Sequence, residues 1–125
     1  MRQCLIGLIP VLLALSGCAA QHALVAASAA PADAPAKTLT IIARKYHFTP
    51  KEIVVKRGTL VRLTLKSEDV THGFALKSAG INVKLPPGQT VEVTFYASQR
   101  GEEGFACSNF CGIGHLAMDG RIIVQ

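Results

Sequence analysis

Two cysteines, a histidine and a methionine lie close together near the C-terminus, as Cys107, Cys111, His115 and Met118. Three residues separate the cysteines, three separate Cys111 from His115, and two separate His115 from Met118. A further histidine, His72, lies upstream in the segment Thr-His-Gly-Phe. Thiolate, thioether and imidazole groups together are the ligand set that favours copper over harder cations. The pattern therefore predicts a copper site to which a separate loop contributes the second imidazole.

Other uses of Cys107 and Cys111 leave part of this pattern without a purpose. The two thiols could close a disulfide in an oxidising compartment. They could also form a thiol redox motif, although that motif usually has two residues between its cysteines, not three. Neither use needs His115 or Met118. Zinc accepts cysteine and histidine, but a thioether is a poor zinc ligand and a common copper ligand, so copper is the prediction.

Alternating apolar and polar residues indicate the scaffold that would carry this site. The alternation is clear in 38–43, 61–66 and 91–95, and two further short strands are expected at 52–56 and 121–125. Proline and glycine lie between these segments, and no long helix is evident. A period of two with turns between short segments predicts an all-β fold, a small antiparallel sandwich over 38–125. We expect Phe48 in its core, and we interpret His47 as structural because it has no ligand partner at metal spacing.

The N-terminal segment has the character of an export signal. Arg2 precedes an apolar run from Leu5 to Leu15 that is too short to span a membrane. Residues 15–18, Leu-Ser-Gly-Cys, resemble the bacterial lipobox, in which the cysteine becomes the lipidated first residue of the mature protein. The alternative is an ordinary signal peptide that is cut elsewhere. We expect a signal peptide at 1–17, lipidation of Cys18, and a protein anchored to a bacterial membrane that faces the periplasm or the cell surface.

Composition adds few constraints beyond these. The segment 18–37 is expected to consist of the lipidated Cys18 and a stretch, 19–37, that is rich in Ala, Ser and Pro. That composition predicts a disordered tether of about 19 residues that reaches roughly 25 Å from the membrane. His22 lies in this stretch and is given no role. The net charge of +5 comes from scattered Lys and Arg residues, so we expect no nucleic-acid partner. Two of the four cysteines lie outside the predicted domain, which excludes a multi-disulfide framework.

The stretch at 107–118, Cys-Ser-Asn-Phe-Cys-Gly-Ile-Gly-His-Leu-Ala-Met, resembles the loop of the binuclear copper centre, CuA, in cytochrome c oxidase subunit II. Residues 69–74, Asp-Val-Thr-His-Gly-Phe, resemble the strand end that provides the other histidine in that family. The likeness covers 38–125 and implies a cupredoxin-like Greek-key β-sandwich. It also implies two Cu ions bound by six residues. His72 and His115 would bind one copper each, Cys107 and Cys111 would bridge both, and Met118 and the backbone carbonyl of Asn109 would be axial ligands.

The resemblance implies a one-electron carrier that is not an enzyme by itself and takes no small-molecule substrate. It would pass electrons from a donor such as a cytochrome c to a terminal acceptor. Two coppers that share three positive charges against two thiolates give a site of +1, which becomes neutral when one electron arrives. This small change suits a closed, partly apolar pocket, where a large net charge would be costly.

Two other copper functions remain open at this point. A mononuclear blue-type centre needs one cysteine only, but an unused thiol beside a redox-active copper would be prone to oxidation, which favours two coppers. A periplasmic copper chaperone would use the same ligands for transfer, although such proteins favour methionine and histidine on exposed, flexible segments. A thiol-based sensor or assembly reductase would leave His72, His115 and Met118 without a purpose.

The sequence also departs from subunit II. Subunit II has two N-terminal transmembrane helices, whereas the only hydrophobic run here is the short signal, so we expect a free-standing, lipid-tethered domain. Asn109 replaces an acidic residue that in the family reaches towards a metal at the interface with the catalytic subunit. The chain has no tryptophan, which the family uses where cytochrome c docks. Tyr46, Phe74 and Phe110 could supply an aromatic surface or could equally be packing residues.

Overall fold

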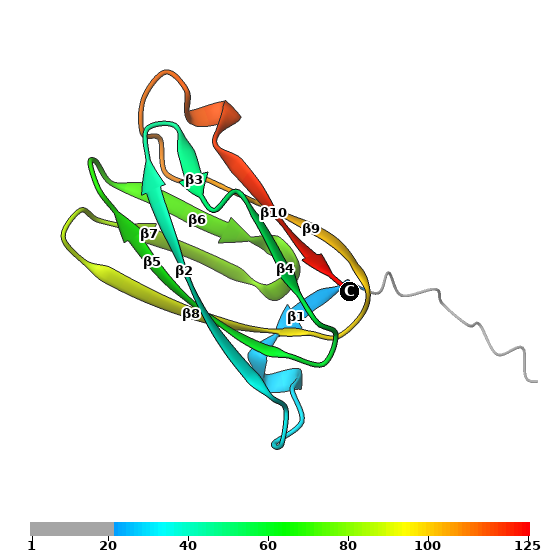
Figure 1. The fold of residues 1–125 in the computed structure, drawn as a ribbon. Coiled ribbons are helices and arrows are strands. Elements are labelled where there is room, and N and C mark those ends of the chain that lie inside the picture. Colours follow the sequence, from blue (N-terminus) through cyan, green and yellow to red (C-terminus); the bar gives the residue numbers. More distant parts are fainter. Residues whose placement is uncertain (1–21) are drawn as a thin grey trace, which may run out of the picture.

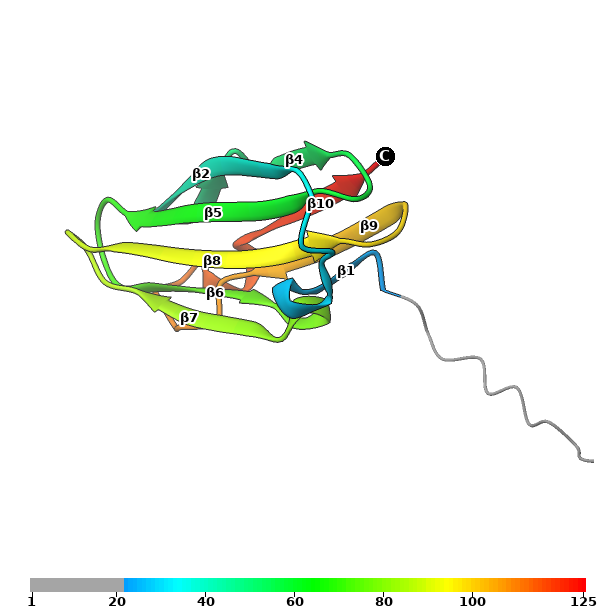
Figure 2. The same cartoon turned by 90° about the horizontal axis from the view of Figure 1, so that it is seen from below.

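The structure is a computed structural model that describes residues 22–125. These residues form two five-stranded sheets packed face to face (Figures 1 and 2). The strands are β1 (Leu24–Ala26), β2 (Ala36–Arg44), β3 (His47–Thr49), β4 (Glu52–Val55), β5 (Leu60–Ser67), β6 (His72–Leu76), β7 (Ile81–Leu85), β8 (Thr90–Ala97), β9 (Gly101–Ala106) and β10 (Asp119–Val124). Three single-turn 3₁₀ helices lie between strands: η1 (Ala27–Ala29), η2 (Lys77–Ala79) and η3 (His115–Ala117). The predicted all-β sandwich is confirmed.

The sheets contain parallel as well as antiparallel pairs. One sheet has the order β1-β8-β5-β2-β3 and the other β4-β10-β9-β6-β7. The pairs β2–β5 and β4–β10 are parallel, and the others are antiparallel. The chain crosses from β3 to β4 in the opposite sheet before it returns as β5, and such a crossover is what parallel neighbours require. The expected small antiparallel sandwich thus also contains two parallel pairs, which the sequence pattern did not indicate, because a period of two says which face is buried but not which way the neighbouring strand runs.

The core follows the predicted alternation. Ile41, Leu63 and Phe95 point inward from neighbouring strands and are fully buried. Phe48, Phe74 and Phe105 form an aromatic cluster with ring centroids 5.0 to 6.1 Å apart, which confirms Phe48 as a core residue. Edge-on and tilted aromatic pairs of this kind are favourable beyond their buried area.

The stretch that we expected to be a disordered tether is ordered from Leu24 onward. β1 pairs with the edge of β8, and the Leu24 side chain is fully buried. The carbonyl of Ala23 accepts hydrogen bonds from the backbone N–H groups of Ser98 (3.0 Å) and Gln99 (3.3 Å). The Ala- and Ser-rich stretch shows no periodicity, yet three of its residues pair with β8, which would otherwise be the edge strand of its sheet. The backbone hydrogen bonds of this pairing hold the stretch in place. β2 also begins at Ala36, before the predicted domain boundary.

Cys18 and the predicted signal peptide lie outside the described residues. Within 22–125, no helix has the length and apolar character needed to cross a membrane.

Candidate metal centre

One end of the sandwich collects the segments that carry the predicted ligands. β9 and β10 pair with Ala106 opposite Asp119, so the loop between them begins and ends at the same place. The backbone N–H of Cys107 donates to the carbonyl of Met118 across the base of that loop (3.0 Å). β6 is the neighbour of β9 and begins at His72. Three strands therefore bring His72 and the loop 107–118 together.

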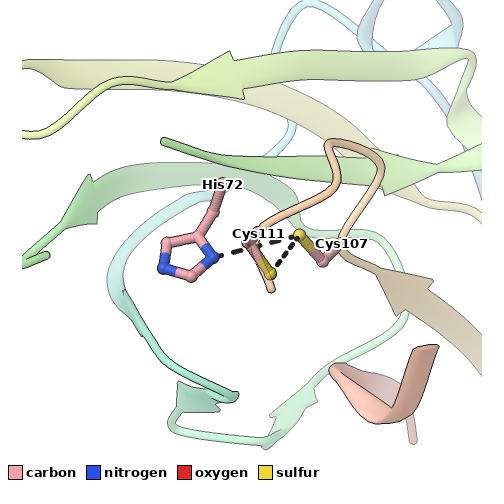
Figure 3. Close-up of side chains that lie close together, drawn as sticks. All are labelled: His72, Cys107 and Cys111. Carbon is pink, nitrogen blue, oxygen red and sulfur yellow. Dashed lines mark hydrogen bonds between the residues drawn. The ribbon is translucent and has the colours of Figure 1, made fainter. Parts of the chain in front are cut away.

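The two thiols and His72 face one another inside the protein (Figure 3). The Sγ atoms of Cys107 and Cys111 are 3.7 Å apart, and His72 Nδ1 lies 4.0 Å from the sulfur of Cys107. His72 is fully buried, and the two cysteines are 7% exposed. Both cysteines are free thiols in the structure.

The other predicted ligands divide between the two sulfurs. Cys111 Sγ lies 3.6 Å from Nδ1 of His115 and 3.8 Å from Sδ of Met118. Cys107 Sγ lies 3.2 Å from the carbonyl oxygen of Asn109. Each thiol thus has one imidazole and one weaker donor beside it, and all six residues predicted from the sequence lie in one cluster.

Asp69 supports the buried imidazole from behind. Its carboxylate oxygen Oδ1 accepts a hydrogen bond from Nε2–H of His72 at 2.6 Å, which leaves Nδ1 directed at the thiols. The same carboxylate accepts the backbone N–H groups of Lys45 and Val70, both at 2.7 Å. Burial acts to raise the pKa of Asp69, but these backbone hydrogen bonds and His72 outweigh it and lower the pKa to about 2. Asp69 is thus a fixed negative charge.

The thiol of Cys111 is held in its neutral form when no metal is present. Burial, followed by the hydrogen bond and charge of Cys107, raises the pKa of Cys111 to about 11. A metal that binds this sulfur must therefore displace a proton at neutral pH.

Close backbone approaches fix the shape of the loop. Gly73 donates its backbone N–H to Cys107 Sγ (3.4 Å), and a Cβ at Gly73 would lie 2.7 Å from the backbone nitrogen of Asn109. Gly112, at φ +137°, and Gly114 lie against the ring of Tyr46, which a Cβ at either position would overlap. The loop is therefore clamped between β6 on one side and Tyr46 on the other.

Three exposed apolar side chains lie in the same loop as His115. Within the described residues, Phe110, Ile113 and Leu116 are 77%, 100% and 95% exposed. The ring of Phe110 lies 5.6 Å from that of His115, which is itself half-buried. This group of residues, Phe110, Ile113 and Leu116, is called the apolar rim below.

Some sequence expectations about single residues are also resolved. His47 is exposed at the start of β3 and takes no part in the cluster. His22 is exposed, and its Nδ1 lies 3.5 Å from Oε1 of Glu103. Of the three aromatic residues that could have formed a surface, Phe74 is buried, Tyr46 packs on the loop, and Phe110 is exposed.

Asp69 and Tyr46 support the ligands, whereas sequence reasoning gave Asp69 no role and considered Tyr46 as a possible surface aromatic residue. Asp69 could have been found, because a metal-binding histidine usually donates its second ring N–H to a carboxylate, a carbonyl or a water, and Asp69 lies three residues before His72. Nothing in the sequence indicated that Tyr46 packs on the loop, because Tyr46 is far from the loop in the sequence.

The donor set fits copper. Two thiols, a thioether, two imidazole nitrogens and one carbonyl converge at a largely buried point, and this soft combination with a thioether is typical of copper sites. Zinc sites, by contrast, are built from cysteine, histidine and carboxylates.

A match to a domain family and matches to individual proteins agree on the relationship of this chain to known proteins. A cupredoxin-like domain matches residues 8–124. Cytochrome c oxidase subunit 2 of Thermus thermophilus is 33% identical over 88 residues, which cover 70% of this chain and 65% of that protein. Nitrous-oxide reductase of Stutzerimonas stutzeri is 37% identical over 82 residues, which cover 62% of this chain and 13% of the reductase. The chain thus spans less than two thirds of the length of either relative.

A solved structure of a heme-copper terminal oxidase dimer contains a chain with a similar fold. The TM-score is 0.69 at 32% identity, and the match covers 74% of this chain and 66% of the other. The strand arrangement, the clustered His, Cys and Met side chains and these matches agree. The chain belongs to the cupredoxin-like domain family and is related to cytochrome c oxidase subunit 2 and nitrous-oxide reductase.

Proposed function

We propose that this protein is an exported, lipid-anchored one-electron carrier whose centre holds two Cu ions in a CuA-type arrangement. The observation that carries the proposal is the placement of the two thiols, 3.7 Å apart, each with its own imidazole and its own weaker donor. A mononuclear centre would need only one of these thiols. Two thiols between two sets of outer ligands suit a pair of metals that share both sulfurs.

When bound, the copper pair would supply reversible one-electron transfer. The residues of the chain would keep the structural rearrangement between the two redox states small. The ligands lie at the ends of β6, β9 and β10, which pair with one another. Such support limits how far His72, Cys107 or Met118 can move between redox states. Six protein ligands also leave no open position for a substrate, which favours a carrier over an enzyme.

The apolar rim around His115 suits a redox partner protein. Exposed aromatic and aliphatic side chains in one place mark a surface that contacts other molecules. His115 is the ligand nearest this surface, so an electron would enter or leave there. We propose a partner such as a cytochrome c, because a related protein is named as a subunit of cytochrome c oxidase.

The proposal of export and lipidation rests on the N-terminal sequence alone. Leu-Ser-Gly-Cys at 15–18 follows an apolar run of signal-peptide length. We propose that Cys18 carries the lipid and that the domain works at a bacterial membrane, facing the periplasm or the cell surface.

Metal analysis combined with a redox titration tests the function. The purified protein, loaded with copper, should hold about two coppers per chain and accept one electron per two coppers. Cys111→Ser should lose the shared electron and hold at most one copper, while the matched loop variant Ile113→Ser, on a fully exposed side chain, should behave as the wild type. One copper that takes one electron would favour a blue-type centre, and copper held only as loosely bound Cu(I) would favour a chaperone. Either result would overturn the proposal.

A further inference from the structure

The N-terminal end of the described chain is fixed to the domain at Ala23. Its backbone N–H donates to Oε1 of Glu103 (3.0 Å), and its carbonyl accepts from the backbone N–H groups of Ser98 and Gln99. The next residue, Leu24, is fully buried. The point of attachment is therefore Ala23, and not the start of β2.

This attachment shortens the distance to the proposed lipid. Ala23 follows Cys18 by five residues in the sequence. Even a fully extended chain spans at most about 3.6 Å per residue, or roughly 18 Å over that length. The surface around Ala23 must then lie close to the membrane whenever Cys18 is anchored.

Ala23 lies at the opposite end of the sandwich from the candidate copper site. Gly101, which begins β9, pairs with Val124 at the end of β10, whereas the loop 107–118 joins the other ends of these strands. At about 3.3 Å per residue, β9 separates the two ends by roughly 17 Å. Figure 1 shows the loop at the top and the C-terminus at the far end of β9 and β10.

A basic cleft adjoins the point of attachment. It has a volume of about 460 Å³ and is lined by Arg57, Ser98, Gln99 and Arg100. Ser98 and Gln99 are the residues that hold the carbonyl of Ala23, so the cleft and the attachment share a wall. Arg57 is fixed in part by a hydrogen bond from Nε to the carbonyl of Ser98 (3.3 Å).

The charges at this end favour an anionic partner. Within residues 22–125, neither Arg57 nor Arg100 forms an ion pair with a carboxylate. The nearby acidic residues already have partners, because Glu102 pairs with Arg121, and Glu103 accepts the N–H of Ala23 and lies 3.5 Å from Nδ1 of His22. Guanidinium groups bind phosphate well because their planar array of donors matches its oxygens.

We propose that this end of the domain, marked by Arg57, Ser98, Gln99 and Arg100, rests on anionic phospholipid headgroups. The loop 107–118 and the apolar rim then face away from the bilayer, where a partner protein can reach them. The inference rests on the proposed lipidation of Cys18 and adds an orientation to it. A lipid anchor with a nearby basic patch is also the combination that gives stable membrane attachment.

Depth measurements test the orientation directly, because the chain has no tryptophan of its own. Gln125→Trp places a reporter at the C-terminus, next to Arg57, whose backbone N–H donates to the carbonyl of Gln125. Ile113→Trp places one in the loop. Both are built in the full-length lipidated protein, on vesicles of phosphatidylcholine and phosphatidylglycerol with brominated acyl chains. Quenching should be clearly stronger for Gln125→Trp, and equal or stronger quenching of Ile113→Trp would overturn the orientation.

A charge-matched pair of variants tests the role of the arginines. The double variant Arg57→Gln, Arg100→Gln should bind anionic headgroups more weakly, by roughly 5-fold in affinity for each arginine removed. The difference in quenching between the two reporters should therefore become smaller. The control is Lys66→Gln with Lys84→Gln, which removes the same charge at the copper end, where Lys84 pairs with Gly73. A control that lowers the difference as much as the arginine variant would contradict a role for the cleft.

Mass spectrometry of the mature N-terminus distinguishes a failure of the proposed lipid anchoring from a failure of the proposed orientation. An unmodified Cys18 would overturn both the anchoring and the orientation, while copper content and electron count would remain as expected for the carrier. A lipidated Cys18 with the opposite order of quenching would overturn the orientation alone.

Discussion

The carboxylate of Asp69 holds Nε2 of His72 at 2.6 Å, and the other ring nitrogen of His72 faces the sulfur of Cys107 at 4.0 Å. The carboxylate is itself fixed by the backbone N–H groups of Lys45 and Val70. The orientation of the buried imidazole is thus determined by Asp69, three residues upstream in the same segment, and by the backbone of Lys45 in the turn between β2 and β3. Second ring nitrogens held in this way set the tautomer and basicity of a ligating histidine.

Asp69→Asn should raise the reduction potential, because it removes a negative charge that favours the more positive, oxidised centre. Asp69→Ala also removes the hydrogen bond, and it should lower copper affinity by roughly 10- to 100-fold. Voltammetry and competition titration of copper measure the two effects. Glu92→Gln, at an exposed position of β8 in the sheet opposite that of His72, removes the same charge and serves as the control. An equal rise in potential in both charge variants would count against a specific role for Asp69.

The same residue predicts how the metal-free protein responds to acid. The pKa of Asp69 is lowered to about 2 from an ordinary value of 3.8. A lowered carboxyl pKa stabilises the fold above the unfolded value, and the contribution is lost as pH falls through the folded value. The stability difference between wild type and Asp69→Asn should therefore be constant above about pH 5 and shrink towards pH 2. Urea unfolding of the apo proteins measures it, and a difference that does not change over this range would refute the assignment.

Gly114→Ala should destabilise the loop, because its Cβ would overlap the Tyr46 ring. Overpacking of this kind typically costs about 1–3 kcal/mol. Gly104→Ala is the matched control, since the nearest atom to its Cβ would be at an ordinary 3.8 Å. Adding Tyr46→Ala to Gly114→Ala should recover part of the lost stability. Thermal unfolding of the apo variants measures this, and equal losses in Gly114→Ala and Gly104→Ala would mean that the contact with Tyr46 is unimportant.

Met118→Leu should keep copper and shift the reduction potential, because a thioether beside two thiolates is expected to be a weak axial ligand. Met118 is 1% exposed, and leucine has a similar volume, so the fold should lose less than about 1.5 kcal/mol. Copper content and voltammetry decide the outcome. Complete loss of metal from a folded variant would make Met118 a primary ligand.

The sequence predicted most of the core and the ligand cluster because both leave local patterns. Leu63 and Phe95 lie in clear alternations, and Cys111, His115 and Met118 lie in one loop whose spacing is itself the signal. His72 was found through its residue type and its expected strand end. These features depend on short stretches of chain, which a sequence displays directly.

Features that depend on distant pairing were not predictable in this way. Leu24 is buried because β1 covers the edge of β8, a strand some seventy residues away, and nothing in the surrounding Ala- and Ser-rich stretch indicates it. The parallel pairing of β2 with β5 depends on the crossover between sheets. The contact of Tyr46 with Gly112 and Gly114 likewise exists only once β2, β3 and the loop are assembled.

The central claim is that two coppers share both thiols, and electron paramagnetic resonance of the copper-loaded protein tests it most directly. The account predicts one unpaired electron with hyperfine coupling to two equivalent copper nuclei, and it predicts that Cys111→Ser removes this coupling. Hyperfine coupling to a single copper nucleus in the wild type, or an unchanged spectrum in Cys111→Ser, would contradict it.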